Sequence, residues 1–213
     1  MYLDRWYNIY KVLITTSHRP TRNTRRFVKV LSKVIPYSKR VNRGKLTLKQ
    51  LALQAIDSGF NAIIVVRNRK GNPGYIDFYS VAPSGELIKE CTLRICGYAI
   101  PSDYKKLTHA TKVVLNLEEV LQESKQQNRN EQIDELKTLD CIIRMFNVIM
   151  SAGRDRHSNI SGGICMHITT SHKESEHKEG KIFDIIFTRC SNNEILFRIS
   201  VCNSSRMSQA ATD

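Results

Sequence analysis

The sequence predicts a mixed α/β fold organised as two α/β halves. The chain has 213 residues, of which 41% are hydrophobic and 25% charged, values typical of a globular protein with a substantial core. Apolar, β-branched runs at residues 10–17 and 61–67 indicate buried strands, and segments of helical periodicity separate them. A boundary at residues 101–107 separates this pattern from a second set of strands and helices.

The first half is predicted to have the order β-α-α-β-β. Thr21 and Thr47 stand where side-chain hydroxyls cap helix starts. Pro36 and Gly59 stand where helices end. The predicted elements are a strand at 10–17, helices at 22–35 and 48–58, a strand at 61–67, a tight turn at 69–74, and strands at 75–81 and 86–95.

The second half is predicted to end in three strands in hairpin order. Its elements are a strand at 112–117, helices at 118–127 and 131–150, a loop at 153–163, and strands at 164–170, 181–189 and 194–202. Helical spacing in the longer helix predicts a core-facing stripe of Ile133, Leu136, Ile143, Phe146 and Met150. We expect domains at 1–104 and 105–203 and a flexible tail at 204–213. The sequence ITTSH occurs at 14–18 and again at 168–172. Two explanations stay open: chance similarity and a degenerate duplication.

The excess positive charge is concentrated at the start of the chain. The formal net charge is +13, and residues 1–50 hold 13 Lys and Arg against one acid, Asp4. The rest of the chain holds 20 basic and 19 acidic residues and is nearly neutral. A localised basic block indicates a polyanionic partner, with a solvated basic face as the alternative.

The helix predicted at 22–35 has one cationic and one apolar face. At 100° per residue, its five cations fall within a single sector, and its apolar residues fall in the opposite one. Like charges at these spacings repel, and the segment contains no acid to relieve them. We therefore expect an anion on that face. The preceding loop adds hydroxyls and a helix N-terminus, which favours phosphate.

Nearby loops extend this candidate surface. The predicted RNA-binding residues are Ser17, His18, Arg19, Arg22, Arg25, Arg26, Lys29, Lys33, Lys39, Arg40, Arg43, Lys45, Arg69 and Lys70. These cations and hydroxyls predict RNA binding that weakens as salt rises and that depends on the shape of the RNA rather than on its sequence. The candidates for base stacking are few, Tyr37 and Tyr75, so we expect structured RNA rather than splayed single strands.

The other chemistry-bearing residues do not favour an enzyme or a cofactor. Phosphate-loop and dinucleotide-binding glycine motifs do not occur, and the basic block lacks clustered carboxylates. The spacing of Cys165, His167, His172 and His177 does not favour a metal site. We expect no catalytic residue, metal, cofactor or small-molecule substrate.

The six cysteines and the apolar runs bear on the compartment. No Cys-x-x-Cys pair occurs, so we expect buried free thiols. No stretch approaches the roughly 20 apolar residues of a membrane helix, and the N-terminus does not read as a signal peptide. We expect a protein without membrane partners that stays in the cytoplasm, or in the nucleolus if its source is eukaryotic.

The basic segment resembles the Brix-domain family of ribosome-biogenesis proteins. The resemblance rests on VLITTSHRPTRNTRRFVK at 12–29 and continues through VIP at 34–36, RGK at 43–45, AIIVV at 62–66, KGNPG at 70–74 and IDFY at 76–79. His18 stands where the family pattern has an arginine. The compact chain is more similar to the archaeal members than to the eukaryotic ones, which include proteins of the U3 small nucleolar ribonucleoprotein.

The resemblance implies a non-catalytic protein that binds precursor ribosomal RNA and assists its processing, together with other assembly proteins. It also implies two halves that are each similar to the anticodon-binding domain of class II aminoacyl-tRNA synthetases. Two alternatives stay open: a transfer-RNA-binding accessory module, and a scaffold whose basic face docks an acidic protein.

Overall fold

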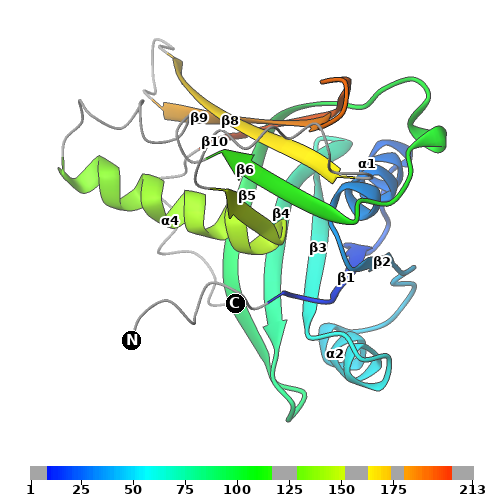
Figure 1. Ribbon diagram of the computed structural model, residues 1–213. Coiled ribbons are helices and arrows are strands. Elements are labelled where there is room, and N and C mark those ends of the chain that lie inside the picture. The colour runs from blue at the N-terminus through cyan, green and yellow to red at the C-terminus, as the bar shows by residue number, and fades with distance from the viewer. Residues whose placement is uncertain (1–8, 117–128, 152–162, 174–179, 203–213) are drawn as a thin grey trace.

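The computed structural model describes residues 9–116, 129–151, 163–173 and 180–202, and the prediction of a mixed α/β fold is confirmed (Figure 1). Three α-helices lie in these ranges: α1 (Arg22–Val34), α2 (Leu48–Asp57) and α4 (Arg129–Met145). The strands are β1 (Val12–Thr16), β2 (Ser38–Arg40), β3 (Ala62–Arg69), β4 (Asn72–Val81), β5 (Leu87–Ala99), β6 (Lys112–Asn116), β7 (Val148–Ser151), β8 (Gly163–Lys173), β9 (Gly180–Arg189) and β10 (Ile195–Cys202). A single 3₁₀ turn, η2 (Tyr104–Lys106), lies between β5 and β6.

All ten strands form one continuous sheet in which the second half repeats the connectivity of the first. The order is β2-β1-β3-β4-β5-β10-β9-β8-β6-β7. In the first half β1 lies between β2 and β3, parallel to both, and β3, β4 and β5 follow as antiparallel neighbours. In the second half β6 lies between β7 and β8, parallel to both, and β8, β9 and β10 follow in the same way. The antiparallel pair β5–β10 joins the halves.

Equivalent positions of the two halves share local features. Tyr37 and Asn147 both adopt left-handed backbone conformations, with φ of 56° and 52°, directly before the edge strands β2 and β7. The repeated sequence ITTSH does not follow this equivalence, because its first copy begins in β1 and its second lies in β8, whereas β1 corresponds to β6. The strand connectivity therefore repeats, but the two copies of ITTSH are not a remnant of that structural repeat.

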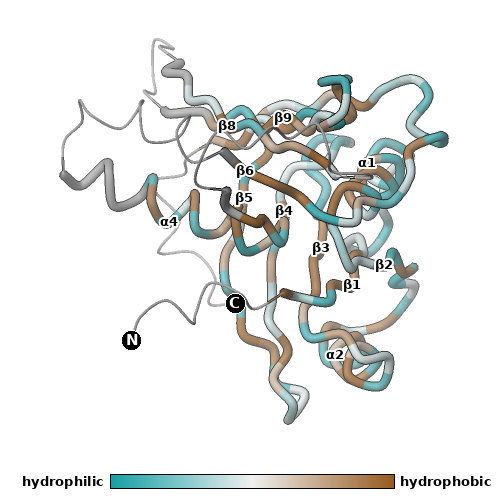
Figure 2. The backbone as a smooth tube through the Cα atoms, in the orientation of Figure 1, coloured by the Kyte–Doolittle hydropathy of each residue, from teal (hydrophilic) through white to brown (hydrophobic). Residues whose placement is uncertain are grey.

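The two faces of the sheet have separate hydrophobic clusters. Because side chains alternate along a strand, Val12 and Ile14 of β1 point to one face and Leu13 to the other. The larger cluster joins apolar residues of both halves to α1 and α4. The smaller cluster holds α2. Figure 2 shows strongly hydrophobic segments along β3 and β6, which enter this packing.

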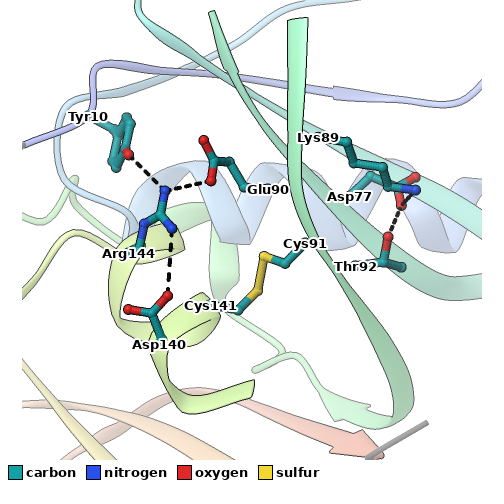
Figure 3. Close-up of a disulfide and its surroundings, with 9 residues drawn as sticks. All are labelled: Tyr10, Asp77, Lys89, Glu90, Cys91, Thr92, Asp140, Cys141 and Arg144. Carbon is teal, nitrogen blue, oxygen red and sulfur yellow. Dashed lines mark hydrogen bonds and ion pairs between the residues drawn. A yellow bond between two sulfur atoms is a disulfide. The ribbon is translucent and has the colours of Figure 1, made fainter. Parts of the chain in front are cut away.

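The end of α4 is fastened to the first half of the chain (Figure 3). The Asn147 side chain accepts a hydrogen bond from Tyr10 N at 2.8 Å and donates to Tyr10 O at 2.7 Å and Pro36 O at 3.1 Å. The Arg144 guanidinium donates to Glu90 at 2.7 Å and to the Tyr10 hydroxyl at 3.1 Å. Burial alone would lower the pKa of Arg144, but these two partners raise it above its ordinary value.

The prediction of the long helix was wrong at its C-terminal end, and one strand was not predicted. The helix predicted at 131–150 ends at Met145, because left-handed Asn147 turns the chain into β7. Its predicted core residue Leu136 is 64% exposed, whereas Ile143 and Phe146 are buried as predicted. Met150 belongs to β7 rather than to the helix. Strand β2 was not predicted, because its sequence, SKR, has neither alternation nor β-branched residues.

The prediction of free thiols was also wrong. The structure pairs Cys91 with Cys141, Cys96 with Cys202, and Cys165 with Cys190. The partners are 25 to 106 residues apart in the sequence, and neighbouring elements such as β5 and β10 bring them together. Sequence spacing carries no information about such pairs.

The remaining strands and helices agree with prediction to within a few residues. Thr21 and Thr47 cap α1 and α2 as predicted, and Thr47 forms a reciprocal capping box with Gln50. Three predicted features lie outside the described residues: the helix at 118–127, most of the loop at 153–163, and the tail at 204–213.

The Asn147 tether gives a stability prediction. Asn147→Gly keeps the left-handed backbone but removes the three side-chain hydrogen bonds, so we expect the free energy of unfolding in urea to fall by about 2 kcal/mol. Asn147→Ala should cost about 1 kcal/mol more because alanine resists a positive φ. The matched control is Asn193→Gly, at a left-handed asparagine in the exposed turn before β10, with an expected change below about 0.5 kcal/mol. Equal effects at both positions would contradict the tether.

Candidate nucleic-acid interface

The parallel arrangement of β1, β2 and β3 brings three polar loops to one edge of the sheet. Carboxyl ends of parallel strands meet at the same edge, so residues 17–21, 41–47 and 70–71 follow their strands there. Helix α1 begins at this edge, directly after Thr21. The His18 ring lies within hydrogen-bonding distance of Gly44 O, at 3.2 Å, and so links two of the loops.

A network of uncharged polar side chains fixes the start of α1 against the β3–β4 hairpin. The buried Thr24 hydroxyl donates to Asn68 at 2.6 Å, and the Asn68 amide donates to Arg19 O at 3.1 Å. The neighbouring residue Asn23 donates to Asn72 at 2.9 Å, and the Tyr98 hydroxyl donates to the same oxygen at 3.1 Å. The loop that holds Ser17, His18 and Arg19 is therefore positioned by side chains that carry no charge.

Helix α1 presents its predicted cationic face. Phe27, Val28 and Leu31 are at most 2% exposed and fix the apolar side of the helix in the core. On the other side, Arg22, Arg25 and Lys29 are exposed. The structure thus confirms the opposition of the two faces, although two of the five cations are engaged internally.

Arg26 and Lys33 contact the segment between β5 and β6. The Arg26 guanidinium lies 5.1 Å from the centroid of the Tyr104 ring, a cation–π arrangement. The Lys33 ammonium donates to the carbonyls of Leu107, Lys105 and Tyr104 at 2.5, 2.9 and 3.4 Å, and Ala110 N donates to Lys33 O at 2.7 Å. Lys33 therefore anchors the η2 segment to the last turn of α1.

Anchoring this segment creates a cationic pocket of about 480 Å³ between α1, β2 and η2. Its lining residues are Lys29, Ser32, Lys33, Ser38, Lys39, Arg40, Tyr104, Lys105 and His109. No carboxylate is among these described lining residues. The Ser38 hydroxyl donates to Ser32 O at 2.9 Å, which holds the start of β2 against the helix.

The predicted residues thus fall into two adjoining groups. The group at the sheet edge is Ser17, His18, Arg19, Arg22, Arg25, Arg43, Lys45, Arg69 and Lys70. The group at the pocket is Lys29, Lys33, Lys39 and Arg40, with Arg26 stacked on the pocket residue Tyr104. Burial lowers the pKa of Arg43, whose Nε donates to Leu46 O at 3.0 Å.

The two candidate stacking tyrosines differ in position. Tyr37 is 56% exposed between α1 and β2, next to the pocket residue Ser38. Tyr75 is half-buried under the Arg67 guanidinium, 4.6 Å from the ring centroid. Because Ile76 belongs to the larger hydrophobic cluster, Tyr75 lies on the opposite face of the sheet from α1.

The ion pairs of the described residues involve cations outside the candidate interface. Arg67 and Lys89 pair with Asp77, Arg144 with Glu90 and Asp140, Arg189 with Glu194, and Arg198 with Asp184. Burial alone would raise the pKa of Asp77, but hydrogen bonds from Arg67 and Thr92 and the charges of Arg67 and Lys89 hold it below its usual value. Within the described ranges, none of the predicted RNA-binding cations forms an ion pair.

Besides Ser32 and Ser38, sequence reasoning missed the pocket residues Tyr104, Lys105 and His109. They lie about 70 residues beyond α1, in a stretch that reads only as a boundary between halves. The one available signal was the run YKK at 104–106, an aromatic residue followed by two cations. The described part of the chain holds no cluster of potential metal ligands and no helix long and apolar enough to cross a membrane.

The fold and site define a mixed α/β protein with an unpaired cationic face at one end of a ten-stranded sheet. No protein-family model matches the chain. A probable Brix domain-containing ribosomal biogenesis protein from Pyrococcus horikoshii is 46% identical over 72 residues, which are 34% of this chain and 32% of that protein. A protein of the same description from Saccharolobus solfataricus is 32% identical over 94 residues, 44% of this chain and 54% of that protein.

The chain resembles the archaeal Brix domain-containing proteins, as its basic segment predicts. The matched segments span between about a third and about half of these relatives. The crystal structure of a probable ribosomal biogenesis protein from Aeropyrum pernix superposes with a TM-score of 0.67 at 22% identity, covering 93% of this chain and 98% of that one. The two proteins therefore share their fold over nearly the whole chain.

The contacts of Lys33 give a prediction that separates structural from surface cations. Lys33→Met removes the donor to three carbonyls, so we expect the free energy of unfolding to fall by about 2 kcal/mol. The matched control is Lys29→Met, one turn earlier on the exposed side of α1, with an expected change below about 0.5 kcal/mol. Urea denaturation followed by circular dichroism measures both. Equal stability of the two variants would show that Lys33 does not anchor η2.

Proposed function

We propose that this protein is a non-catalytic ribosome-biogenesis factor that binds precursor ribosomal RNA through α1 and the loops beside it. The observation that carries the proposal is the set of exposed cations on one face of α1, a helix without acidic residues, none of which forms an ion pair within the described residues. Unpaired like charges on one helix repel each other, and an anionic partner removes that cost. The resemblance to archaeal Brix domain-containing ribosomal biogenesis proteins favours ribosomal RNA as the polyanion.

The chemistry of the face favours the phosphate backbone over base edges. Exposed Arg22, Arg25 and Lys29 supply mobile charges, and the start of α1 supplies backbone N–H groups. Hydroxyls and the ring of His18 lie at the same sheet edge. These groups position and neutralise phosphates, and we infer that the protein recognises structured RNA by its shape.

The proposed role includes partners and organisation. We infer that residues 1–104 and 105–203 are related units, each similar to an anticodon-binding domain, and that the first carries the RNA-binding face. The repeated strand connectivity supports this relation. Other assembly proteins would bind while precursor RNA is processed in the cytoplasm, or in the nucleolus of a eukaryotic source.

The salt dependence of RNA binding tests the proposal. We expect log Kd for a structured precursor-rRNA fragment to rise steeply with log salt between about 50 and 200 mM KCl, measured by fluorescence anisotropy. Arg25→Gln and Lys29→Gln should each lower the slope by about 0.7–1, the loss of one phosphate contact. Lys49→Gln is the matched control: it removes an equal charge from an exposed site on α2, and the slope should not change.

Three outcomes would contradict this function. RNA binding that does not depend on salt, or no RNA binding at all, excludes a polyanionic partner on this face. Transfer RNA that competes with ribosomal RNA helices at equal concentration favours a transfer-RNA-binding module. A protein partner that stays bound to the tagged chain after ribonuclease digestion, and is lost in Arg25→Gln, favours docking of an acidic protein.

A further inference from the structure

The pocket between α1, β2 and η2 has features that a phosphate-backbone surface does not require. It is a concave space of about 480 Å³, whereas contacts to a duplex backbone need only exposed cations. That volume falls in the range of about 300–1,000 Å³ typical of small-molecule and cofactor sites, so it is far larger than one phosphate group needs. The pocket therefore suits a ligand that has a bulky uncharged part as well as a charged group.

The charge of the lining indicates an anionic ligand. Lys29, Lys33, Lys39, Arg40 and Lys105 come from the consecutive elements α1 and β2 and from the distant η2, and the described lining has no carboxylate to neutralise them. The Lys33 ammonium donates to the carbonyls of Lys105 and Leu107 and lies beside the pocket. Lys39 and Arg40 belong to the edge strand β2, which leaves one side of that strand without a neighbouring strand.

The aromatic residue of the lining indicates the chemical nature of the bulky part of the ligand. Tyr104 is half-buried and packs partly against the core, and the Arg26 guanidinium stacks on its ring. A fixed aromatic ring beside a guanidinium plane is a surface on which an unstacked base binds in many RNA-binding proteins. Because Lys29 belongs both to the α1 face and to the pocket, an RNA on that face passes the pocket mouth.

We propose that this pocket binds one unpaired nucleotide of the RNA, with its base against Tyr104 and its phosphates beside Lys39, Arg40 and Lys105. This inference rests on the proposed function, because it assumes that RNA occupies the α1 face. The unpaired nucleotide has two possible sources, a bulge within a helix or a single-nucleotide overhang at its end. Both present the same chemistry, an unstacked base with flanking phosphates.

The test compares three RNAs that differ only in the unpaired nucleotide: a perfect duplex, the same duplex with a single-nucleotide bulge, and the same duplex with a one-nucleotide overhang. We expect the 213-residue chain to bind the bulged RNA, the overhang RNA or both about tenfold more tightly than the perfect duplex, as one stacked base provides. The RNA that binds more tightly than the perfect duplex shows whether the unpaired nucleotide comes from a bulge or from an overhang.

Two pocket variants and one face variant complete the design. Tyr104→Leu keeps apolar contact with the core but removes the ring, and Lys39→Gln alters an exposed edge-strand residue outside the core. Each should reduce the preference for an unpaired nucleotide to about twofold or less. Tyr104→Leu should also leave binding of the perfect duplex within about threefold, whereas Lys39→Gln removes a cation of the predicted RNA-binding set and is judged by the preference alone. Arg25→Gln, outside the pocket lining, should weaken all three RNAs by the same factor.

The outcomes separate this inference from the proposed function. Equal affinity for the three RNAs, or a preference that survives in both pocket variants, overturns the nucleotide pocket and leaves RNA binding by the face intact. Failure to bind any of the RNAs overturns the proposed function as well. If Tyr104→Leu does not fold, as judged by circular dichroism, Lys39→Gln alone decides.

Discussion

The burial of one side of α1 is the constraint on which the candidate site depends. Phe27, Val28 and Leu31 are almost completely enclosed, and each such side chain contributes about 1.5–3 kcal/mol. Repulsion between like charges one turn apart costs only a few tenths of a kcal/mol per pair. Burial therefore dominates, so the helix cannot rotate to disperse its cations. Once the apolar side is fixed, the cations point away from the core, and the parallel strands bring the loop cations to the same end of the sheet.

Local sequence patterns predicted most of the first half, and non-local pairing explains what they missed. Thr21 and Thr47 cap helices because capping depends on residues only three positions away. Strand β2 exists because β1 offers it a parallel partner, although its own sequence favours no strand. The pocket forms because Lys33 contacts Tyr104, a residue 71 positions away in the sequence. The disulfides, such as Cys96–Cys202, likewise follow from sheet order that composition does not reveal.

The two halves share a framework but differ in charge. Helix α4 occupies the position in the second half that α1 occupies in the first, yet its described part carries Glu135 and Asp140 as well as cations. Arg144 of α4 pairs with Asp140 of its own helix and with Glu90 of β5, and the pair with Glu90 holds the halves together. In α1 the corresponding surface has no acid. One fold unit thus serves as structural support in the second half, while in the first half it presents an open cationic face.

Crosslinking between the protein and precursor ribosomal RNA tests the central claim most directly, because it locates the RNA on the surface without relying on a variant. Ultraviolet irradiation of the complex, followed by mass spectrometry of peptide–nucleotide adducts, should place most crosslinks in residues 17–45 and 69–70, with a further set at 104–109. Crosslinks concentrated on α2, on α4 or on the opposite face of the sheet, around Tyr75 and Arg198, would contradict the account.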